Sequence, residues 1–169
     1  MKIIFVDGYN VINSWSNLKR EKEISLDSAR QKLVDILHNY GAINRCKIVI
    51  VYDGHRVTGN IENKYEHNKN LLVVFTKDGE TADAYIEREV HNLGRRFEVY
   101  VVTSDSLEQQ TIFQRGAVRI SSIEFYNLVR VDIENVKKNS KKVHVSAKNT
   151  LEDNLDDDVL KKLEAIRRS

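Results

Sequence analysis

The sequence predicts an α/β protein, a three-layer α/β/α sandwich built on a mainly parallel five-stranded sheet. Two observations support this prediction. Short apolar runs of strand length alternate along the chain with segments in which apolar residues recur at helical spacing. The apolar runs are continuous and do not alternate with polar residues, which is typical of strands that are buried on both faces of a parallel sheet.

Five apolar runs are predicted to be strands, and several of them are rich in β-branched residues. The predicted strands are residues 2–6, 47–52, 71–76, 98–103 and 117–120. The segment 53–70 is polar, and we expect it to be a loop. The chain contains no proline, so glycine and polar clusters separate the elements.

Capping residues indicate where the helices begin and end. Ser25 is predicted to cap a helix that stops at Gly41, and Thr81 a helix that stops at Gly94. Residues 121–124 match a capping box, in which a serine and a glutamate three residues apart bond each other's backbone N–H groups. The predicted helices are residues 26–40, 82–93, 107–114 and 122–138.

The chain of 169 residues is predicted to form one domain, residues 1–138, followed by a tail, residues 139–169. A domain of this size buries roughly two-thirds of its surface and needs no disulfide or structural metal. We expect the tail to be a polar linker and a short C-terminal amphipathic helix. The apolar residues of that helix are Val159, Leu160, Leu163 and Ile166.

Charge and cysteine content restrict the class of protein. The chain has 27 basic and 25 acidic residues, and its net charge of +2 does not by itself indicate nucleic-acid binding. The single cysteine, Cys46, adjoins an apolar run and is predicted to be buried, which suits a reducing compartment. The N-terminal apolar run does not match a signal peptide, because Asp7 interrupts it. No apolar run approaches the roughly 20 residues of a membrane span. We therefore expect a soluble, cytoplasmic protein.

Acidic residues follow three of the predicted strands. Asp7 and Asp53 come directly after their strands, and Asp105 comes two residues after its strand. Asp83 lies in the first turn of a predicted helix, with Glu80 just before that helix. Because the carboxyl ends of parallel strands meet at one edge of a sheet, we expect these side chains to share that edge.

Clustered carboxylates repel one another unless cations neutralise them, and Mg²⁺ or Mn²⁺ prefers such oxygen ligands. The cluster therefore predicts metal-assisted phosphodiester cleavage, in which the ion activates a water and no protein nucleophile is required. The alternative is structural, because aspartate commonly caps helices and shapes turns. The sequence lacks the short motifs of phosphate-binding loops, zinc proteases and CxxC sites.

Four segments resemble a known series of motifs. They are Asp7-Gly8-Tyr9-Asn10-Val11-Ile12, Val51-Tyr52-Asp53-Gly54, Thr81-Ala82-Asp83-Ala84-Tyr85-Ile86-Glu87 and Val102-Thr103-Ser104-Asp105. On these motifs, residues 1–137 resemble the YacP-like branch of the NYN family, within the PIN-like nuclease superfamily. The tail from residue 139 is outside the resemblance. The resemblance implies a PIN-like fold and a divalent-metal endoribonuclease.

The resemblance also implies roles for individual residues. Asp7, Asp83 and Asp105 would hold Mg²⁺ or Mn²⁺, and Asn10 would orient a water or a phosphate oxygen. Glu80 is a further candidate metal ligand. The candidate substrate contacts beside these residues are Gly8, Asp53, His55, Arg56 and Ser104. For His55 and Arg56, the alternative is that they are ordinary loop residues.

Family members similar to this chain include a nuclease that cuts messenger RNA inside the ribosome, so the resemblance implies mRNA as substrate and the ribosome as partner. A nearly neutral chain binds free RNA weakly, which fits a nuclease that docks on a platform. The candidate docking segments are 17–22, 55–70 and the lysine-rich 137–148, all of which could instead be solvated loop or linker. Three alternatives stay open: a nuclease of free rRNA or tRNA, a PIN-type toxin, and a non-catalytic RNA-binding or ribosome-associated module.

Overall fold

The computed structural model describes residues 1–54, 61–104 and 116–152 and the single residues 162 and 165; of residues 144–152 it describes the backbone only. The chain divides into two units, Met1–Asp132 and Ile133–Ser169. Among the described residues, the buried apolar core lies entirely in the first unit. Cys46 belongs to this core, as predicted. No helix in the described part of the chain is long and apolar enough to cross a membrane.

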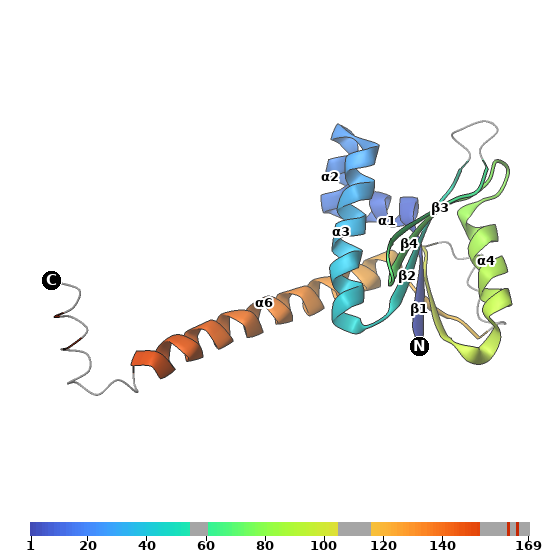
Figure 1. The fold of residues 1–169 in the computed structure, drawn as a ribbon. Helices are drawn as coiled ribbons and strands as arrows, with labels where there is room; N and C mark the ends of the chain where they lie inside the picture. Colours follow the sequence, from blue (N-terminus) through green and yellow to red (C-terminus); the bar gives the residue numbers. More distant parts are fainter. Residues whose placement is uncertain (55–60, 105–115, 153–161, 163–164, 166–169) are drawn as a thin grey trace. The chain divides into compact units, whose positions relative to one another are not determined.

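A six-stranded sheet forms the centre of the first unit, in the order β3-β4-β2-β1-β5-β6 (Figure 1). Its neighbouring strands are parallel except for β3, which is antiparallel to β4. The strands are β1 Lys2–Asp7, β2 Lys47–Tyr52, β3 Asn63–Asn68, β4 Leu71–Phe75, β5 Glu98–Val102 and β6 Val118–Ile120. The predicted mainly parallel sheet is confirmed, although it has six strands and not five.

The additional strand is β3, and it corrects the prediction that 53–70 is all loop. Its side chains are exposed or half-buried, so its sequence carries no apolar pattern. An edge strand needs only backbone pairing with one neighbour, and β4 provides that pairing. The register shifts between Glu66 and Asn68, which is a bulge typical of sheet edges.

Helices cover both faces of the sheet, which confirms the three layers. Figure 1 shows α1, α2 and α3 on one face and α4 on the other. Within the described residues the helices are α1 Gly8–Ser14, α2 Ser16–Ile24, α3 Leu26–Asn44, α4 Ala82–Leu93, a short 3-10 helix Gly94–Arg96 and α6 Ser122–Glu152. The predicted helix 107–114 lies outside the described residues.

The predicted N-terminal caps are confirmed. Ser25 and Thr81 accept backbone N–H bonds from Ser28 and Ala84. In the capping box of α6, Glu124 N–H donates to Ser121 Oγ at 3.2 Å, and Ser121 N–H donates to Glu124 Oε2 at 2.9 Å. These local bonds explain why the sequence alone locates the starts of α3, α4 and α6.

Helix α4 ends at Leu93 with Gly94 as its C-cap, as predicted, whereas the end of α3 and the first two helices differ from the prediction. Helix α3 continues through Gly41, which is buried, and is closed by Arg45 in the left-handed conformation (φ 50°). Helices α1 and α2 occupy a region without a predicted element, so the candidate docking segment 17–22 is helical. The local signal was weak because α1 is short and α2 buries only Leu18.

Helix α6 is longer than predicted. It was expected to end near residue 138, but it continues to Glu152, so the first part of the expected polar linker is helical. Its opening turns pack in the first unit, where Phe125 is fully buried against Trp15 and Tyr40. The expected helix over 159–166 lies outside the described residues apart from 162 and 165. The boundary after residue 138 stays a prediction.

Candidate active site

The site begins at the carboxyl end of β1, in the middle of the sheet. Strand β1 lies between β2 and β5 and is parallel to both, so the chain crosses over in opposite directions on its two sides. This arrangement is a topological switch point, where open α/β sheets bind their ligands. Asp7 is the last residue of β1 and also the N-cap of α1, because its Oδ1 accepts the N–H of Asn10 at 3.2 Å.

Two further aspartates approach Asp7. Burial and the neighbouring carboxylates of Asp83 and Asp53 raise the pKa of Asp7 from 3.8 to about 7, although the N–H of Asn10 acts to lower it. Within the described part of the chain, Asp83 Oδ1 is buried and has no hydrogen-bond partner. Asp53 and Asp83 therefore lie near enough to Asp7 to act on its charge, and a cation bound beside them would relieve that repulsion.

Glu80 lies at the same end of α4 but has a different partner. Its Oε1 forms an ion pair with Arg88, whose other guanidinium nitrogen is 3.2 Å from Glu62 Oε2. Glu80 is only 9% exposed, and its Oε2 is buried without a partner among the described residues. Any metal contact of Glu80 would therefore use Oε2, because Arg88 occupies the other oxygen.

Two glycines let the backbone approach other groups closely. A Cβ atom on Gly8 would lie 2.2 Å from the ring of Tyr52, and one on Gly54 would lie 1.8 Å from the carbonyl oxygen of Thr76. Gly54 N–H also donates to Thr76 Oγ at 2.9 Å, and that hydroxyl donates to Glu80 O at 2.6 Å. The turn after Asp53 is thus fixed to the segment that precedes α4.

Asn10 is held by a residue far away in the sequence. Ser122 Oγ donates to Asn10 Oδ1 at 2.5 Å, and Ser104 Oγ donates to Ser122 Oγ at 3.1 Å. Trp15 Nε1 fixes the backbone of Ser122 through a 2.8 Å bond to its carbonyl oxygen. Because Asn10 Oδ1 is engaged, Nδ2 is the atom that Asn10 can offer to a substrate oxygen.

Part of the predicted site is not tested. Asp105, His55 and Arg56 lie outside the described residues. Among the residues that are described, no three histidine, cysteine, aspartate or glutamate side chains form a group that could hold a metal ion. The described carboxylates still fit such an ion chemically, since Asp83 Oδ1 is buried without a partner among the described residues, and burial together with the neighbouring acids raises the pKa of Asp7.

The sequence did not indicate Ser122, Thr76 or Arg30 as site residues. Ser122 and Thr76 are fully buried and bond the site from other elements, and Arg30 on α3 donates to Tyr9 Oη at 2.9 Å. The capping box drew attention to Ser121, and Ser122 is the next residue in the chain. No local pattern reveals such partners, because the contacts join distant parts of the chain.

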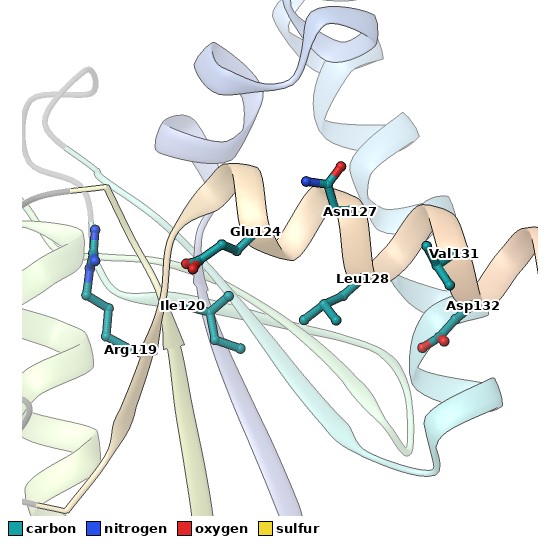
Figure 2. A pocket seen from close by; sticks show the side chains of 7 residues that line it. All are labelled: Arg119, Ile120, Glu124, Asn127, Leu128, Val131 and Asp132. Atoms are coloured by element: carbon teal, nitrogen blue, oxygen red, sulfur yellow. The ribbon is translucent and has the colours of Figure 1, made fainter.

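A hollow of about 510 Å³ lies between β6 and the beginning of α6 (Figure 2). Its lining residues are Arg119, Ile120, Glu124, Asn127, Leu128, Val131 and Asp132. The carboxylate of Glu124 serves the capping box, and that of Asp132 accepts from Asn44 Nδ2 at 3.0 Å. Figure 2 shows these two acids at opposite ends of the hollow, so it contains no carboxylate cluster.

The fold and the matching family model define a nuclease-type α/β domain of the NYN class. The chain belongs to the YacP-like NYN domain family, whose model matches residues 4–168. This match extends the family resemblance through the tail, which the sequence motifs had left out.

Relatives in Bacillus subtilis agree with this assignment. The chain is 36% identical over 169 residues to a protein of strain 168 named "Uncharacterized protein YacP", covering 99% of this chain and 98% of that protein. A crystal structure of Rae1 (YacP) from Bacillus subtilis is 34% identical, with a TM-score of 0.72 over 100% of this chain and 96% of that chain. A mutant of Rae1 is 32% identical, with a TM-score of 0.72 over 84% and 82%.

Proposed function

We propose that the protein is a divalent-metal-dependent endoribonuclease that hydrolyses RNA phosphodiester bonds, and that its substrate is messenger RNA on the translating ribosome. The observation that carries the proposal is the convergence of Asp7, Asp53 and Asp83 at the switch point of the sheet. A protein that only bound RNA would gain nothing from clustered negative charge facing phosphates.

Asp7 and Asp83 are the residues proposed to hold Mg²⁺ or Mn²⁺, together with Asp105. Glu80 is the less favoured ligand, because Arg88 occupies one of its oxygens. When bound, the ion would lower the pKa of a water and neutralise charge on the phosphate.

The other residues of the site act by position. Asn10 would donate from Nδ2 to a phosphate oxygen, since Ser122 holds its Oδ1. Ser104, an exposed residue after β5, would contact the substrate at the same edge. Gly8 and Gly54 let the backbone pack closely against Tyr52 and Thr76. His55 and Arg56, which follow Gly54 in the sequence, are proposed phosphate contacts.

The ribosome is proposed as partner because of the family resemblance and the low net charge of the chain. The net charge of +2 provides little attraction for free RNA, so a docking platform would have to supply affinity. Exposed basic residues on α2, such as Lys19 and Arg20, and the exposed lysines of α6, such as Lys137 and Lys141, are the proposed contact groups.

The test compares purified wild-type protein with Asp7→Asn and Asp83→Asn on ribosome–mRNA complexes and on naked RNA. Each substitution removes a charge that the metal needs, so we expect cleavage to fall by at least about a hundredfold. Asp35→Asn is the matched control, because Asp35 is an exposed acid on α3. Cleavage should stop with a chelator and return with Mn²⁺.

Each outcome has a distinct meaning. Equal cleavage by Asp7→Asn and wild type would reject the site. Cleavage of naked rRNA or tRNA without ribosomes would replace the ribosome-bound mRNA substrate with free RNA. Binding to RNA or ribosomes without any cleavage, and without Mn²⁺ binding by calorimetry, would favour a non-catalytic module.

A further inference from the structure

A second hollow of the first unit, of about 390 Å³, lies between α3 and the edge of the sheet formed by β2, β4 and β3. Its principal lining residues are Arg30, Tyr52, Tyr65, His67, Val73 and Phe75. The register places Tyr52 beside Phe75 and places Tyr65 opposite Val73, so these side chains share the α3 face of the sheet. An edge strand with little apolar pattern thus contributes an aromatic side chain to this face.

Aromatic rings form the floor of this hollow. The rings of Tyr52 and Phe75 stack with centroids 5.2 Å apart and an interplanar angle of 25°. Tyr65 meets Phe75 edge-on, with centroids 6.0 Å apart at 84°. Tyr65 is 58% exposed, which is a large exposed area for an aromatic residue in a strand. Tyr52 is fully buried, so a planar ligand would stack on Tyr65 and the half-buried Phe75 and cover surface that the fold leaves in water.

Arg30 lines the hollow from α3 and lies over these rings. Its guanidinium carbon lies 5.5 Å from the ring centre of Phe75 and 5.9 Å from that of Tyr52. The guanidinium donates to Tyr9 Oη at 2.9 Å and pairs with Asp27, whose side chain is 86% exposed. The planar guanidinium of an arginine and the aromatic rings beside it are both surfaces on which flat groups stack.

The hollow adjoins the carboxylate site through shared residues. Tyr9 lies two residues after Asp7, and its ring centre is 4.9 Å from that of Tyr52. Tyr52 immediately precedes Asp53, and its ring touches the position where Gly8 would carry a Cβ atom. If one phosphate of a polynucleotide is bound at the carboxylates, the neighbouring nucleotide would therefore lie at the aromatic rings of the hollow.

We propose that this hollow binds one base of single-stranded RNA, next to the phosphate that is cleaved. Aromatic rings combined with arginine are how proteins hold unpaired bases, because every base has a π face. The exposed carboxylate of Asp27 can accept from a base amino group but would repel a phosphate, so the hollow suits a base and not the backbone. The inference rests on the proposed RNA substrate and names the part of the RNA that this face holds.

The test is a binding cycle between protein and RNA variants. Full-length protein is titrated by fluorescence anisotropy, at low salt and with a chelator, into labelled single-stranded RNA of about a dozen nucleotides, which spans a typical single-strand site. A set of RNAs lacks the base at one position at a time. The protein variants are Tyr65→Ala, Tyr65→Leu, which keeps apolar bulk without a π face, and Tyr65→Phe, which keeps the ring.

We expect Tyr65→Ala and Tyr65→Leu to weaken binding roughly tenfold, and Tyr65→Phe to bind like the wild type. One RNA lacking a base should bind the wild type and Tyr65→Ala equally, because the partner of Tyr65 is already gone. Arg30→Lys, which keeps the charge but not the guanidinium plane, should weaken binding of the same RNAs. Because Tyr65 is largely exposed, the melting temperature of Tyr65→Ala should stay near that of the wild type.

Four outcomes would overturn the inference in distinguishable ways. If the wild type and Tyr65→Ala bind every RNA with equal affinity, the base subsite is wrong and the nuclease proposal stands. The same conclusion follows if the loss of affinity from Tyr65→Ala and the loss from the missing base multiply at every position of the RNA. If the wild type cleaves ribosome–mRNA complexes but binds none of these RNAs, the base subsite is wrong and the nuclease proposal stands. If the wild type neither binds these RNAs nor cleaves ribosome–mRNA complexes, both proposals fail.

Discussion

Ser122 Oγ donates a 2.5 Å hydrogen bond to Asn10 Oδ1, and it thereby joins two residues that are 112 positions apart in the chain. Ser122 is fully buried and begins α6, whereas Asn10 lies on α1 immediately beside the carboxylate edge. The bond fixes which end of the Asn10 amide faces the site. The start of α6 is therefore part of the active-site support.

Replacing Ser122 by alanine should release Asn10 and lower kcat for RNA cleavage by about tenfold, because a misplaced positioning group weakens the reaction geometry. Mn²⁺ affinity and KM should change little, since Ser122 touches neither the acids nor the substrate. The melting temperature should fall slightly, by the loss of about 1 kcal/mol of hydrogen bonding. Ser140→Ala is the control, because Ser140 is exposed on α6 and bonds only its own helix. An unchanged kcat in Ser122→Ala would contradict this role.

The pH dependence of stability should report the acid cluster. The folded pKa of Asp7 is about 7, above its ordinary 3.8, so the folded state binds a proton more tightly than the unfolded chain. The free energy of unfolding of the metal-free protein should therefore decrease as the pH rises from about 4 to about 7, by up to about 1.4 kcal/mol per unit.

Asp7→Asn should remove most of this decrease, because asparagine can still cap α1 but carries no charge. The variant should melt above the wild type at about pH 8 and close to it at about pH 4, and Mn²⁺ should raise only the wild-type melting temperature. Asp35→Asn should follow the wild type throughout. Parallel pH profiles for Asp7→Asn and wild type would show that the cluster does not perturb Asp7.

The ion pair between Glu80 and Arg88 should stabilise the fold more than it serves a metal. Arg88→Met leaves the buried Glu80 carboxylate unpaired and should cost about 3 kcal/mol in chemical unfolding. Adding Glu80→Gln to Arg88→Met should recover much of that loss, because the buried charge is removed. Glu80→Gln alone should bind Mn²⁺ like the wild type in calorimetry. A clear loss of Mn²⁺ affinity would instead make Glu80 a ligand.

A chain ending at Lys138 should fold without the tail. Among the described residues, every buried apolar residue lies at or before Val129, so truncation removes no known core contact. We expect the same near-ultraviolet circular dichroism and a single cooperative thermal transition within a few degrees of the full chain. Loss of cooperativity would mean that residues 139–169 contribute to the core. Ribosome sedimentation of the same variant would test the proposed role of the lysines that follow residue 138.

Local sequence patterns alone determined much of the architecture. Continuous apolar runs specified five of the six strands, because a strand buried on both faces must be apolar along its whole length. Ser25, Thr81 and Ser121 specified helix starts, because an N-cap bonds only its own first turn. Asp7 and Asp53 could be placed at one edge because parallel strands end together.

Other features were decided only by tertiary structure. Strand β3 forms because β4 supplies its backbone partners, and α3 passes Gly41 because that glycine is buried and tolerated inside the helix. Ser122 supports Asn10, and Arg30 lies over Tyr52, across long stretches of chain. Such contacts leave no period or short motif in the sequence, since each depends on packing between elements that fold together. The sequence thus determined that Asp7 and Asp53 follow neighbouring strands, and the tertiary structure decided which residues hold and surround them.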